Sequence, residues 1–264
     1  MCLLAVLYRL VPESPILVAA NREEYYDRPS LPPSIQSGKP RVLCGVDQRA
    51  GGTWLGVNQH GMFVGLCNRR VPGGAIDPLG ARSRGLLARE VLRSGSARKG
   101  VDKAMEELMT HRYEGLNLIV CDAESGWVVH SDGEQDVQPL EEGLNIIGNM
   151  NMNDPQDERV QLAHRLLTLQ MLDSPVKFLA VASKVFARSP TSQGRPSMVQ
   201  RGNDYGTVSS TLVALSPKPR DAIFQFASGA PDESKYEDYS PMLRDILSSG
   251  LREARSKAKA SGQA

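Results

Sequence analysis

The order of the predicted strands and helices is the feature that most limits how this chain of 264 residues can fold. Groups of short strands alternate with pairs of helices. The strands are short apolar runs bounded by turn residues, and the helices have apolar residues spaced three and four apart. The predicted strands span residues 3–10, 16–20, 42–46, 53–58, 62–68, 116–121, 127–130, 145–148, 207–215 and 222–227, and the predicted helices span 83–93, 101–109, 154–167, 174–187 and 240–251.

The apolar faces of these strands and helices all need to be covered. Two antiparallel sheets stacked face to face, with a helical layer outside each sheet, would bury every one of them. The sequence therefore predicts an α+β fold, a four-layer αββα sandwich, that forms a single domain over residues 1–250. Residues 251–264 alternate Arg and Lys with Ala and Ser, and they are expected to form a basic, disordered tail.

Proline marks both helix starts and irregular segments in this chain. Asp154 and Ser174 each precede a proline, which is typical of an N-cap followed by the first helical turn. The proline-rich segment 25–41 has no apolar period, so we expect an extended surface loop there. The segment 188–204 is rich in Ser, Pro, Gly and Gln, and we expect it to form a mobile loop.

The charge and the hydropathy pattern exclude several classes of function. A net charge of +1 leaves no overall electrostatic footprint for nucleic acid or an anionic membrane. No apolar stretch approaches the roughly 18 residues of a membrane-spanning helix, and Tyr8 and Arg9 interrupt the N-terminal run before it resembles a signal peptide. We therefore expect a cytoplasmic protein with a small-molecule partner, no nucleic acid and no transmembrane segment.

The cysteines and histidines are widely separated along the chain. They form neither a Cys-x-x-Cys pair nor the spacing of a zinc site, so we expect no disulfide framework and no metal centre. Cys67 and Cys121 follow strand-like apolar runs and are expected to be buried. The whole set is Cys2, Cys44, Cys67, Cys121, His60, His111, His130 and His164.

Cys2 is the strongest candidate for a reactive residue. A methionine before a small side chain is usually removed, and removal of Met1 would make Cys2 the first residue. Cys2 would then carry a thiol and a free α-amine, which titrate near ~8.5 and ~8, and such an amine activates a neighbouring nucleophile. The alternative is structural, because cysteine is also common as a small buried residue at the start of a strand.

Several short motifs occur in the order of a known family. With these motifs the chain resembles the NRDE family, the group that includes the transport and Golgi organisation protein 2. The chain departs from the family pattern at Glu23, where the family has Asp, so the charge is kept and an extra methylene changes its placement. The motifs are Met1-Cys2, Ala19-Ala20-Asn21-Arg22-Glu23-Glu24, Arg28-Pro29, Ala50-Gly51-Gly52-Thr53-Trp54-Leu55-Gly56 and Tyr205-Gly206-Thr207-Val208-Ser209-Ser210-Thr211.

The resemblance implies an N-terminal-nucleophile (Ntn) hydrolase-like fold, which is the αββα sandwich already predicted from periodicity. It also implies that a cysteine nucleophile opens the first strand, beside an arginine and an acidic residue on the partner strand of a hairpin. Here these residues are Cys2, Arg22 and Glu23. We expect Arg22 to favour the thiolate by lowering the Cys2 pKa, and Glu23 to orient Arg22 or to bind the α-ammonium. The alternative is a solvated Arg–Glu turn.

Acyl transfer also requires hydrogen-bond donors for the oxyanion. Asn68 ends a predicted strand and Asn149 follows another, so both are candidates by position, and both fit equally well as residues of an Asx turn. Asn21 and Trp54 are predicted to contact the substrate, although Trp54 could equally fill the core. This chemistry requires no cofactor.

Three functions remain open on the sequence. The residues favour a hydrolase of a linear, non-peptide amide bond, in which Cys2 attacks and water completes the cycle. The resemblance alternatively implies a non-catalytic intracellular carrier with haem as a bound ligand, because NRDE-family members are linked to haem trafficking and to Golgi organisation and secretion. The segment 25–41 would serve a third function, protein–protein interaction.

Overall fold

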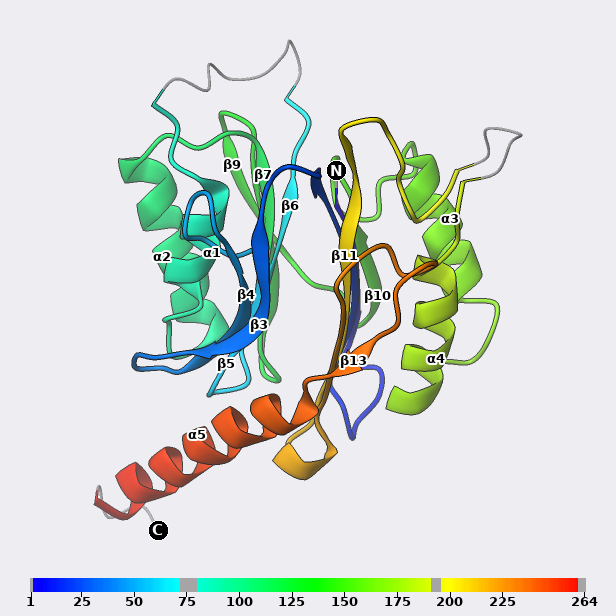
Figure 1. Cartoon of the computed structure of the whole chain (residues 1–264). Helices are drawn as coiled ribbons and strands as arrows, with labels where there is room; N and C mark the ends of the chain where they lie inside the picture. Colours follow the sequence, from blue (N-terminus) through cyan, green and yellow to red (C-terminus); the bar gives the residue numbers. More distant parts are fainter. Residues whose placement is uncertain (1, 72–79, 191–195, 261–264) are drawn as a thin grey trace.

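Two antiparallel sheets stacked face to face form the centre of the protein (Figure 1). The computed structural model describes residues 2–71, 80–190 and 196–260. Sheet A has the strand order β10 (Gly143–Ile147), β1 (Leu3–Tyr8), β2 (Ile16–Tyr25), β11 (Tyr205–Leu215), β12 (Ile223–Ala227) and β13 (Glu237–Asp238). Sheet B has the order β3 (Ser30–Gln36), β4 (Val42–Asp47), β5 (Leu55–Asn58), β6 (Phe63–Asn68), β7 (Leu116–Cys121), β8 (Gly126–Ser131) and β9 (Gln135–Pro139).

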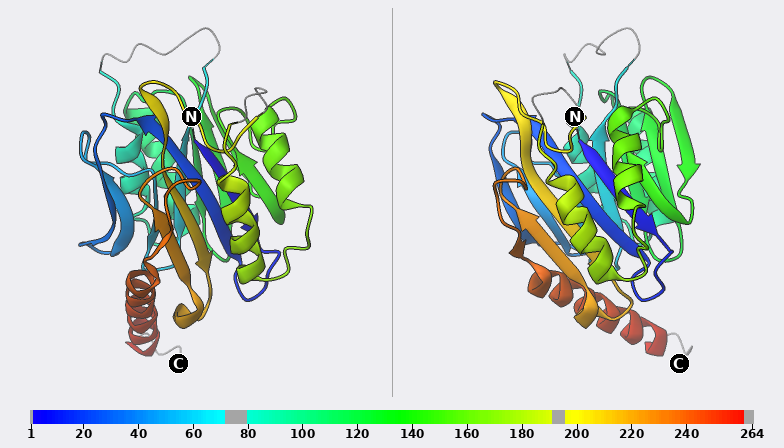
Figure 2. Two further views of the ribbon diagram at one scale, coloured as in Figure 1. Left: turned by 45° about the vertical axis from the view of Figure 1, so that its right-hand side comes forward. Right: turned by 90° about the vertical axis from the view of Figure 1, so that its right-hand side faces the viewer.

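A pair of helices covers the outer face of each sheet. Helices α1 (Arg84–Val91) and α2 (Ala97–Thr110) pack on sheet B, and α3 (Glu158–Leu167) and α4 (Pro175–Phe186) pack on sheet A. The closing helix α5 (Ser240–Ala260) lies across one end of the sandwich and contacts strands of both sheets, whereas β1 begins at the opposite end (Figure 2). The predicted four-layer αββα sandwich is therefore confirmed.

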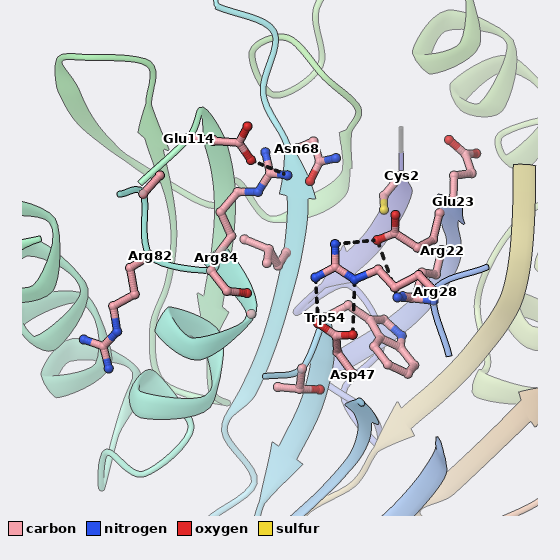
Figure 3. Close-up of a pocket in the computed structure, with 16 residues that line it drawn as sticks. Cys2, Arg22, Glu23, Arg28, Asp47, Trp54, Asn68, Arg82, Arg84 and Glu114 are labelled. Atoms are coloured by element: carbon pink, nitrogen blue, oxygen red, sulfur yellow. Dashed lines mark hydrogen bonds and ion pairs between the residues drawn. The ribbon is translucent and has the colours of Figure 1, made fainter. Parts of the chain in front are cut away.

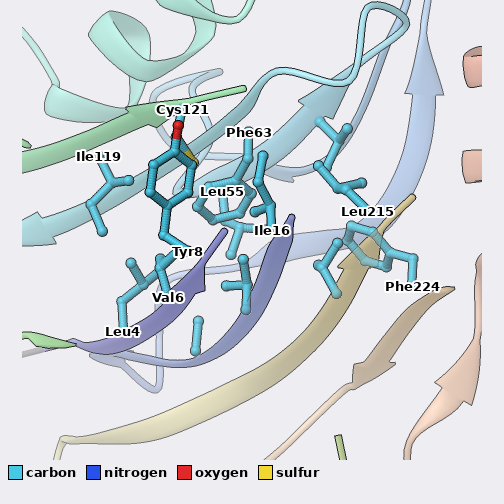
Figure 4. Close-up of a cluster of buried hydrophobic side chains, with 14 of the residues drawn as sticks. Leu4, Val6, Tyr8, Ile16, Leu55, Phe63, Ile119, Cys121, Leu215 and Phe224 are labelled. Atoms are coloured by element: carbon cyan, nitrogen blue, oxygen red, sulfur yellow. The ribbon is translucent and has the colours of Figure 1, made fainter. Parts of the chain in front are cut away.

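Three apolar layers hold these elements together. The central layer lies between the sheets and contains Leu4, Val6, Phe63 and Phe224 (Figure 4). A second layer joins sheet A to α3 and α4, and a third joins sheet B to α1 and α2. Because both faces of the central strands are covered, β1 is buried along its whole length and reads as a continuous apolar run.

Side-chain alternation along β1 and β2 decides which residues face the other sheet. In β1 the even-numbered residues belong to the central layer and the odd-numbered residues face the helices. In β2 the same holds for Val18 and Ala20 against Leu17 and Ala19. Continuing this alternation past Ala20 directs Arg22 toward sheet B, and Asn21 and Glu23 toward the helices.

The proline-rich segment 25–41 is not the loop that the sequence predicted, because it contains β3. This strand lies at the edge of sheet B and pairs only with β4, so the missing N–H groups of its prolines leave no neighbour unpaired. The register shifts between Leu31 and Ser34, which places Pro32 and Pro33 in a bulge. The short edge strands β9 and β13 were not predicted either, because they are mostly exposed and polar.

One of the two proline-marked helix starts is correct. Ser174 caps α4 by accepting a hydrogen bond from the Lys177 backbone N–H, with Pro175 in the first turn. The start at Asp154 was wrong, because α3 begins at Glu158 and its N-cap is Asp157. Residues 154–156 form a turn instead, and Asp157 caps the helix because its side chain accepts hydrogen bonds from the Arg159 and Val160 backbone N–H groups.

Two segments expected to be irregular contain helical or buried residues. Helix α5 continues to Ala260, past the predicted start of the disordered tail at 251. Its final turns carry a Glu253–Lys257 ion pair, and basic residues near a helix C-terminus interact favourably with the helix dipole. Met198 and Val199, in the predicted mobile loop 188–204, are fully buried. Residues 191–195 of that loop and 261–264 of the tail lie outside the described residues.

Within 2–71, 80–190 and 196–260, no helix is long and apolar enough to cross a membrane. The same ranges contain no group of three or more His, Cys, Asp or Glu side chains arranged to hold a metal ion.

The central layer generates a stability prediction. Phe63 is fully buried between the sheets, so Phe63→Ala should lower the free energy of unfolding by about 3–5 kcal/mol, because it removes packing and leaves a cavity. Urea denaturation measures this change. Met171→Ala is the control, since Met171 is exposed on the surface and its loss should change the free energy by less than about 0.5 kcal/mol.

Candidate functional site

The β1–β2 hairpin brings Cys2 and Arg22 together at the end of the sandwich opposite α5. Leu3 pairs with Asn21 in this hairpin, so the next residues outward, Cys2 and Arg22, lie opposite each other. Both side chains lie on the inter-sheet face, where Cys2 packs against the central apolar layer. The predicted pairing of these two residues therefore follows directly from the register.

Cys2 and Arg22 line a pocket of about 240 Å³ between the open ends of the two sheets (Figure 3). Sheet A contributes the hairpin residues, and sheet B with the start of α1 forms the opposite wall. Most of the lining is polar or charged. The lining residues are Cys2, Arg22, Glu23, Glu24, Arg28, Asp47, Thr53, Trp54, Leu66, Asn68, Ala81, Arg82, Ser83, Arg84, Gly85 and Glu114.

Arg22 is held rigidly within this pocket. Its side chain is only 6% exposed, and its guanidinium stacks on Trp54 with 4.4 Å between the guanidinium carbon and the ring centroid. Glu24 lies 3.5 Å from its Nη2. Its Nη1 has no hydrogen-bond partner within the described part of the chain. Burial lowers the pKa of Arg22, and Glu24 opposes that effect.

A chain of charges continues from Arg22 toward sheet B. Glu24 also lies 3.7 Å from Arg28, and Arg28 binds Asp47 through two hydrogen bonds of 3.2 and 2.7 Å. Such a bidentate pair fixes the plane of the guanidinium. The pairing holds the pKa of Asp47 below its usual range, although burial acts in the opposite direction. Glu24 thereby links Arg22 to the Arg28–Asp47 pair, whose two residues are labelled in Figure 3.

Glu23 does not orient Arg22, in contrast to one of its two predicted roles. Its carboxylate faces the helices and binds Arg159 of α3 through hydrogen bonds of 2.5 and 3.2 Å. The reason is the strand alternation, which directs neighbouring residues of β2 to opposite faces. Burial raises the pKa of Glu23, and Arg159 opposes this effect. The carboxylate beside Arg22 is Glu24 instead.

The three predicted asparagines have different positions relative to the pocket. Asn68 lies on the pocket wall (Figure 3). Asn149 donates from Nδ2 to the Asn68 carbonyl oxygen at 2.7 Å, so it contacts the site through Asn68. Asn21 faces the helices, where its Nδ2 donates to the carbonyl oxygens of Phe186 and Met198 at 2.9 and 3.0 Å. Trp54 lies on the pocket wall as predicted and also packs against the central layer.

Sequence reasoning missed the charged residues on the sheet B side of the pocket. Arg84 donates to the Gly115 carbonyl at 3.1 Å and pairs with Glu114 at the same distance, while Arg82 turns away toward Glu107 (Figure 3). Burial lowers the pKa of Arg84, and Glu114 opposes this. Arg84 and Glu114 are far apart in sequence and show no local motif, whereas the Arg28-Pro29 motif was a usable signal for Arg28.

The thiol of Cys2 is less acidic than we predicted. Cys2 is half-buried, and burial raises its pKa above the ordinary thiol value. The Glu23 carboxylate adds to the effect of burial, and the Glu23 backbone N–H and, more weakly, Arg22 lower the pKa without outweighing burial. The pocket therefore presents a thiol and a guanidinium from sheet A facing an amide side chain from sheet B, and burial disfavours the thiolate.

Comparisons with known proteins agree on one family. The family model described as Transport and Golgi organisation 2 matches residues 1–224. The Transport and Golgi organization protein 2 homolog of Bos taurus is 28% identical over 252 residues, covering 84% of this chain and 90% of the bovine protein. The corresponding Homo sapiens homolog is 34% identical over 110 residues, covering 40% of this chain and 38% of the human protein.

Solved structures of Ntn hydrolases share the fold at low sequence identity. The Caenorhabditis elegans ortholog of N-acylethanolamine-hydrolyzing acid amidase has a TM-score of 0.53 at 19% identity, covering 80% of this chain and 92% of its own. Penicillin V acylase from Agrobacterium tumefaciens has a TM-score of 0.50 at 15% identity, with 92% and 88% covered. A variant of conjugated bile acid hydrolase from Clostridium perfringens has a TM-score of 0.52 at 11% identity, with 91% and 93% covered.

The buried position of Cys2 predicts how it reacts with an alkylating reagent. The alkylation rate should rise with pH around a midpoint above the usual ~8.5, because only the thiolate reacts. In Arg22→Met the midpoint should shift further upward, because a charge that lowers the pKa is lost. Peptide mass spectrometry after timed alkylation measures both rates.

Arg98→Met is the matched control for this experiment. Arg98 also stacks on a tryptophan, Trp127 at 5.7 Å, but lies on the exposed face of α2. Its loss should leave the Cys2 profile unchanged. An identical midpoint in the wild type and Arg22→Met would contradict the electrostatic contact between Arg22 and the thiol.

Proposed function

Since the chain belongs to the Transport and Golgi organisation 2 family and has an Ntn-hydrolase-like fold, we propose that it hydrolyses a linear amide bond with Cys2 as the nucleophile after Met1 is removed. The single observation that carries this proposal is the common wall of Cys2 and Arg22. A half-buried thiol faces a pocket beside a buried guanidinium that has an unpartnered N–H group. If Arg22 had only a structural role, its buried Nη1 would not need to be left without a partner beside the Cys2 thiol.

In the first step, the Cys2 sulfur attacks the carbonyl carbon of the amide. The free α-amine of Cys2 accepts the thiol proton, which compensates for the raised thiol pKa, because no thiolate need be present beforehand. The amine then gives this proton to the departing nitrogen as the C–N bond breaks. The product is a thioester between Cys2 and the acyl group.

Charge on the carbonyl oxygen develops during this attack and needs donors. Asn68 on the pocket wall and the unpartnered Nη1 of Arg22 are the candidates, and loss of one such donor typically costs about 3 kcal/mol of barrier. Asn149 is a positioning residue, because its Nδ2 donates to the backbone carbonyl oxygen of Asn68 and so holds Asn68 in place. Water then adds to the thioester, releases the carboxylic acid and restores the thiol.

Glu23 supports this site from the helical side. Its side chain is fully buried and bound to Arg159, so it fixes the end of β2 to α3 just beyond Arg22. Breaking a buried ion pair typically costs about 3–5 kcal/mol when one partner is removed. We propose that Glu23 keeps the Cys2 end of the hairpin in place and that binding of the α-ammonium is its second role.

Haem binding remains the alternative from the family resemblance. Among the described lining residues Cys2 offers the single soft ligand, and no histidine lines the pocket. His130 is buried within sheet B and bound to Asn117, and His164 lies in α3. The lining does not favour a haem carrier, and we derive no step through haem.

The hydrolase proposal predicts a strict dependence on Cys2. Purified protein should lack Met1 by exact mass and should release amine from simple N-acyl amides. Cys2→Ala should reduce this rate to the background of the reaction without enzyme, because no nucleophile remains. Cys44→Ala is the matched control, since Cys44 is buried on the opposite face of sheet B and should leave the rate unchanged.

Either of two results would contradict this function. One is full retention of Met1, which leaves Cys2 without a free amine. The other is equal amine release by Cys2→Ala and the wild type. A Soret band shift on haem addition, lost in Cys2→Ala, would support the carrier function instead.

A further inference from the structure

Cys2 has a second thiol as a neighbour. Beneath the pocket lies a small cavity between the two sheets, and both Cys2 and Cys67 line it. Cys2 is at the start of β1 in sheet A, and Cys67 is near the end of β6 in sheet B. Burial raises the pKa of Cys67 well above its usual range, and the neighbouring Cys2 adds to this effect.

A glycine allows the two sheets to approach closely at this level. A Cβ atom added to Gly65 of β6 would lie 2.9 Å from Leu4 Cδ1 of β1, so Leu4 occupies the space that a side chain at 65 would need. The Cα atoms of β1 and β6 come within 8 Å of each other. Stacked sheets are usually about 10 Å apart, so the sandwich is narrow here.

The two cysteines both face the space between the sheets and line the same small cavity. Side chains two residues apart lie on the same face of a strand. Cys2 therefore lies on the same inter-sheet face as Leu4, and Cys67 lies on the same inter-sheet face as Gly65. Cys67 Sγ lies 3.9 Å from the carbonyl oxygen of Ile147, and Ile147 pairs with Leu4 in sheet A. Cys67 therefore reaches across to sheet A beside the beginning of β1.

The two thiols differ in their access to solvent. Cys2 lines the outer pocket as well as the inner cavity, whereas Cys67 is 2% exposed and lines the inner cavity. A small oxidant that enters the pocket therefore meets Cys2 first. Cys67 is positioned to react only with what forms on Cys2.

We propose that Cys2 and Cys67 form an inter-sheet disulfide when the protein is exposed to a peroxide. The Cys2 sulfur takes one oxygen from hydrogen peroxide as the O–O bond breaks, giving a sulfenic acid and water. The Cys67 sulfur attacks the Cys2 sulfur, the S–O bond breaks, and hydroxide leaves with the Cys67 proton as a second water. Two thiols lose two electrons and two protons, and one peroxide becomes two waters.

This disulfide would act as a reversible block of the site. The disulfide would remove the Cys2 nucleophile and join β1 to β6 across the narrow gap between them. This regulatory consequence rests on the proposed function, in which Cys2 is the nucleophile. The disulfide itself does not rest on that function, since it requires only the placement of the two thiols. A disulfide also protects Cys2 from further, irreversible oxidation to the sulfinic and sulfonic acids.

The test uses the reduced full-length protein treated with excess hydrogen peroxide and then alkylated under denaturing conditions. We expect the intact mass to fall by two hydrogen atoms before alkylation, and two of the four cysteines to escape the alkylation that follows. A tryptic digest without reductant should contain the peptide that ends at Arg9 joined to the peptide 50–69, which contains Cys67. Dithiothreitol should separate them and restore alkylation of Cys2.

Two variants make the assignment specific. Cys67→Ala should give no joined peptide and should let Cys2 gain one to three oxygens, whereas Cys44→Ala should behave as the wild type. Three results would overturn the proposal: a joined peptide from Cys44 or Cys121, a disulfide between two chains on non-reducing electrophoresis, or oxygen addition to wild-type Cys2 as in Cys67→Ala. None of these readouts depends on amide hydrolysis, so they are independent of the proposed function.

Discussion

The register of the β1–β2 hairpin is the constraint on which the candidate site depends. With Leu3 opposite Asn21, every second residue of both strands faces the other sheet, and Cys2 and Arg22 fall on that face together. A slip of one residue between the two strands would turn one of these side chains toward the helices and separate it from the other. The apolar layers on either side of sheet A prevent such a slip, because it would exchange their side chains. The packing of residues far from the pocket therefore determines which side chains face into it.

The same alternation separates two neighbouring acidic residues into two tasks. Glu24 lies in the pocket and links Arg22 to the Arg28–Asp47 pair. Glu23 lies on the other face and fastens the strand to α3 through Arg159. One charge network, which includes Arg22, thus lies on the pocket face of β2, and another lies on its helix-facing side. The rigid, desolvated guanidinium that results has an N–H group left for a ligand.

Periodicity in the sequence was sufficient for the layers, because each apolar stripe needs a partner surface and few arrangements provide one. The family resemblance, combined with the local β1–β2 hairpin, was sufficient to place Arg22 beside Cys2. Periodicity failed for β3, where prolines hide an edge strand, and for the start of α3, where Asp157 competes with Asp154 as the cap. Arg84 and Glu114 could not be predicted, because only the tertiary fold brings them to the pocket. The pKa of Cys2 was misjudged because burial, which the sequence does not show, outweighs the nearby charge.

The bulged β3 also has a consequence for how copies of this protein meet. A free sheet edge normally offers a row of N–H and C=O groups to any passing strand. At the β3 edge, Pro32 and Pro33 supply no N–H groups, and the shift in register interrupts the regular spacing that a new strand would have to match. This edge of sheet B is therefore poorly suited to pair with a further strand.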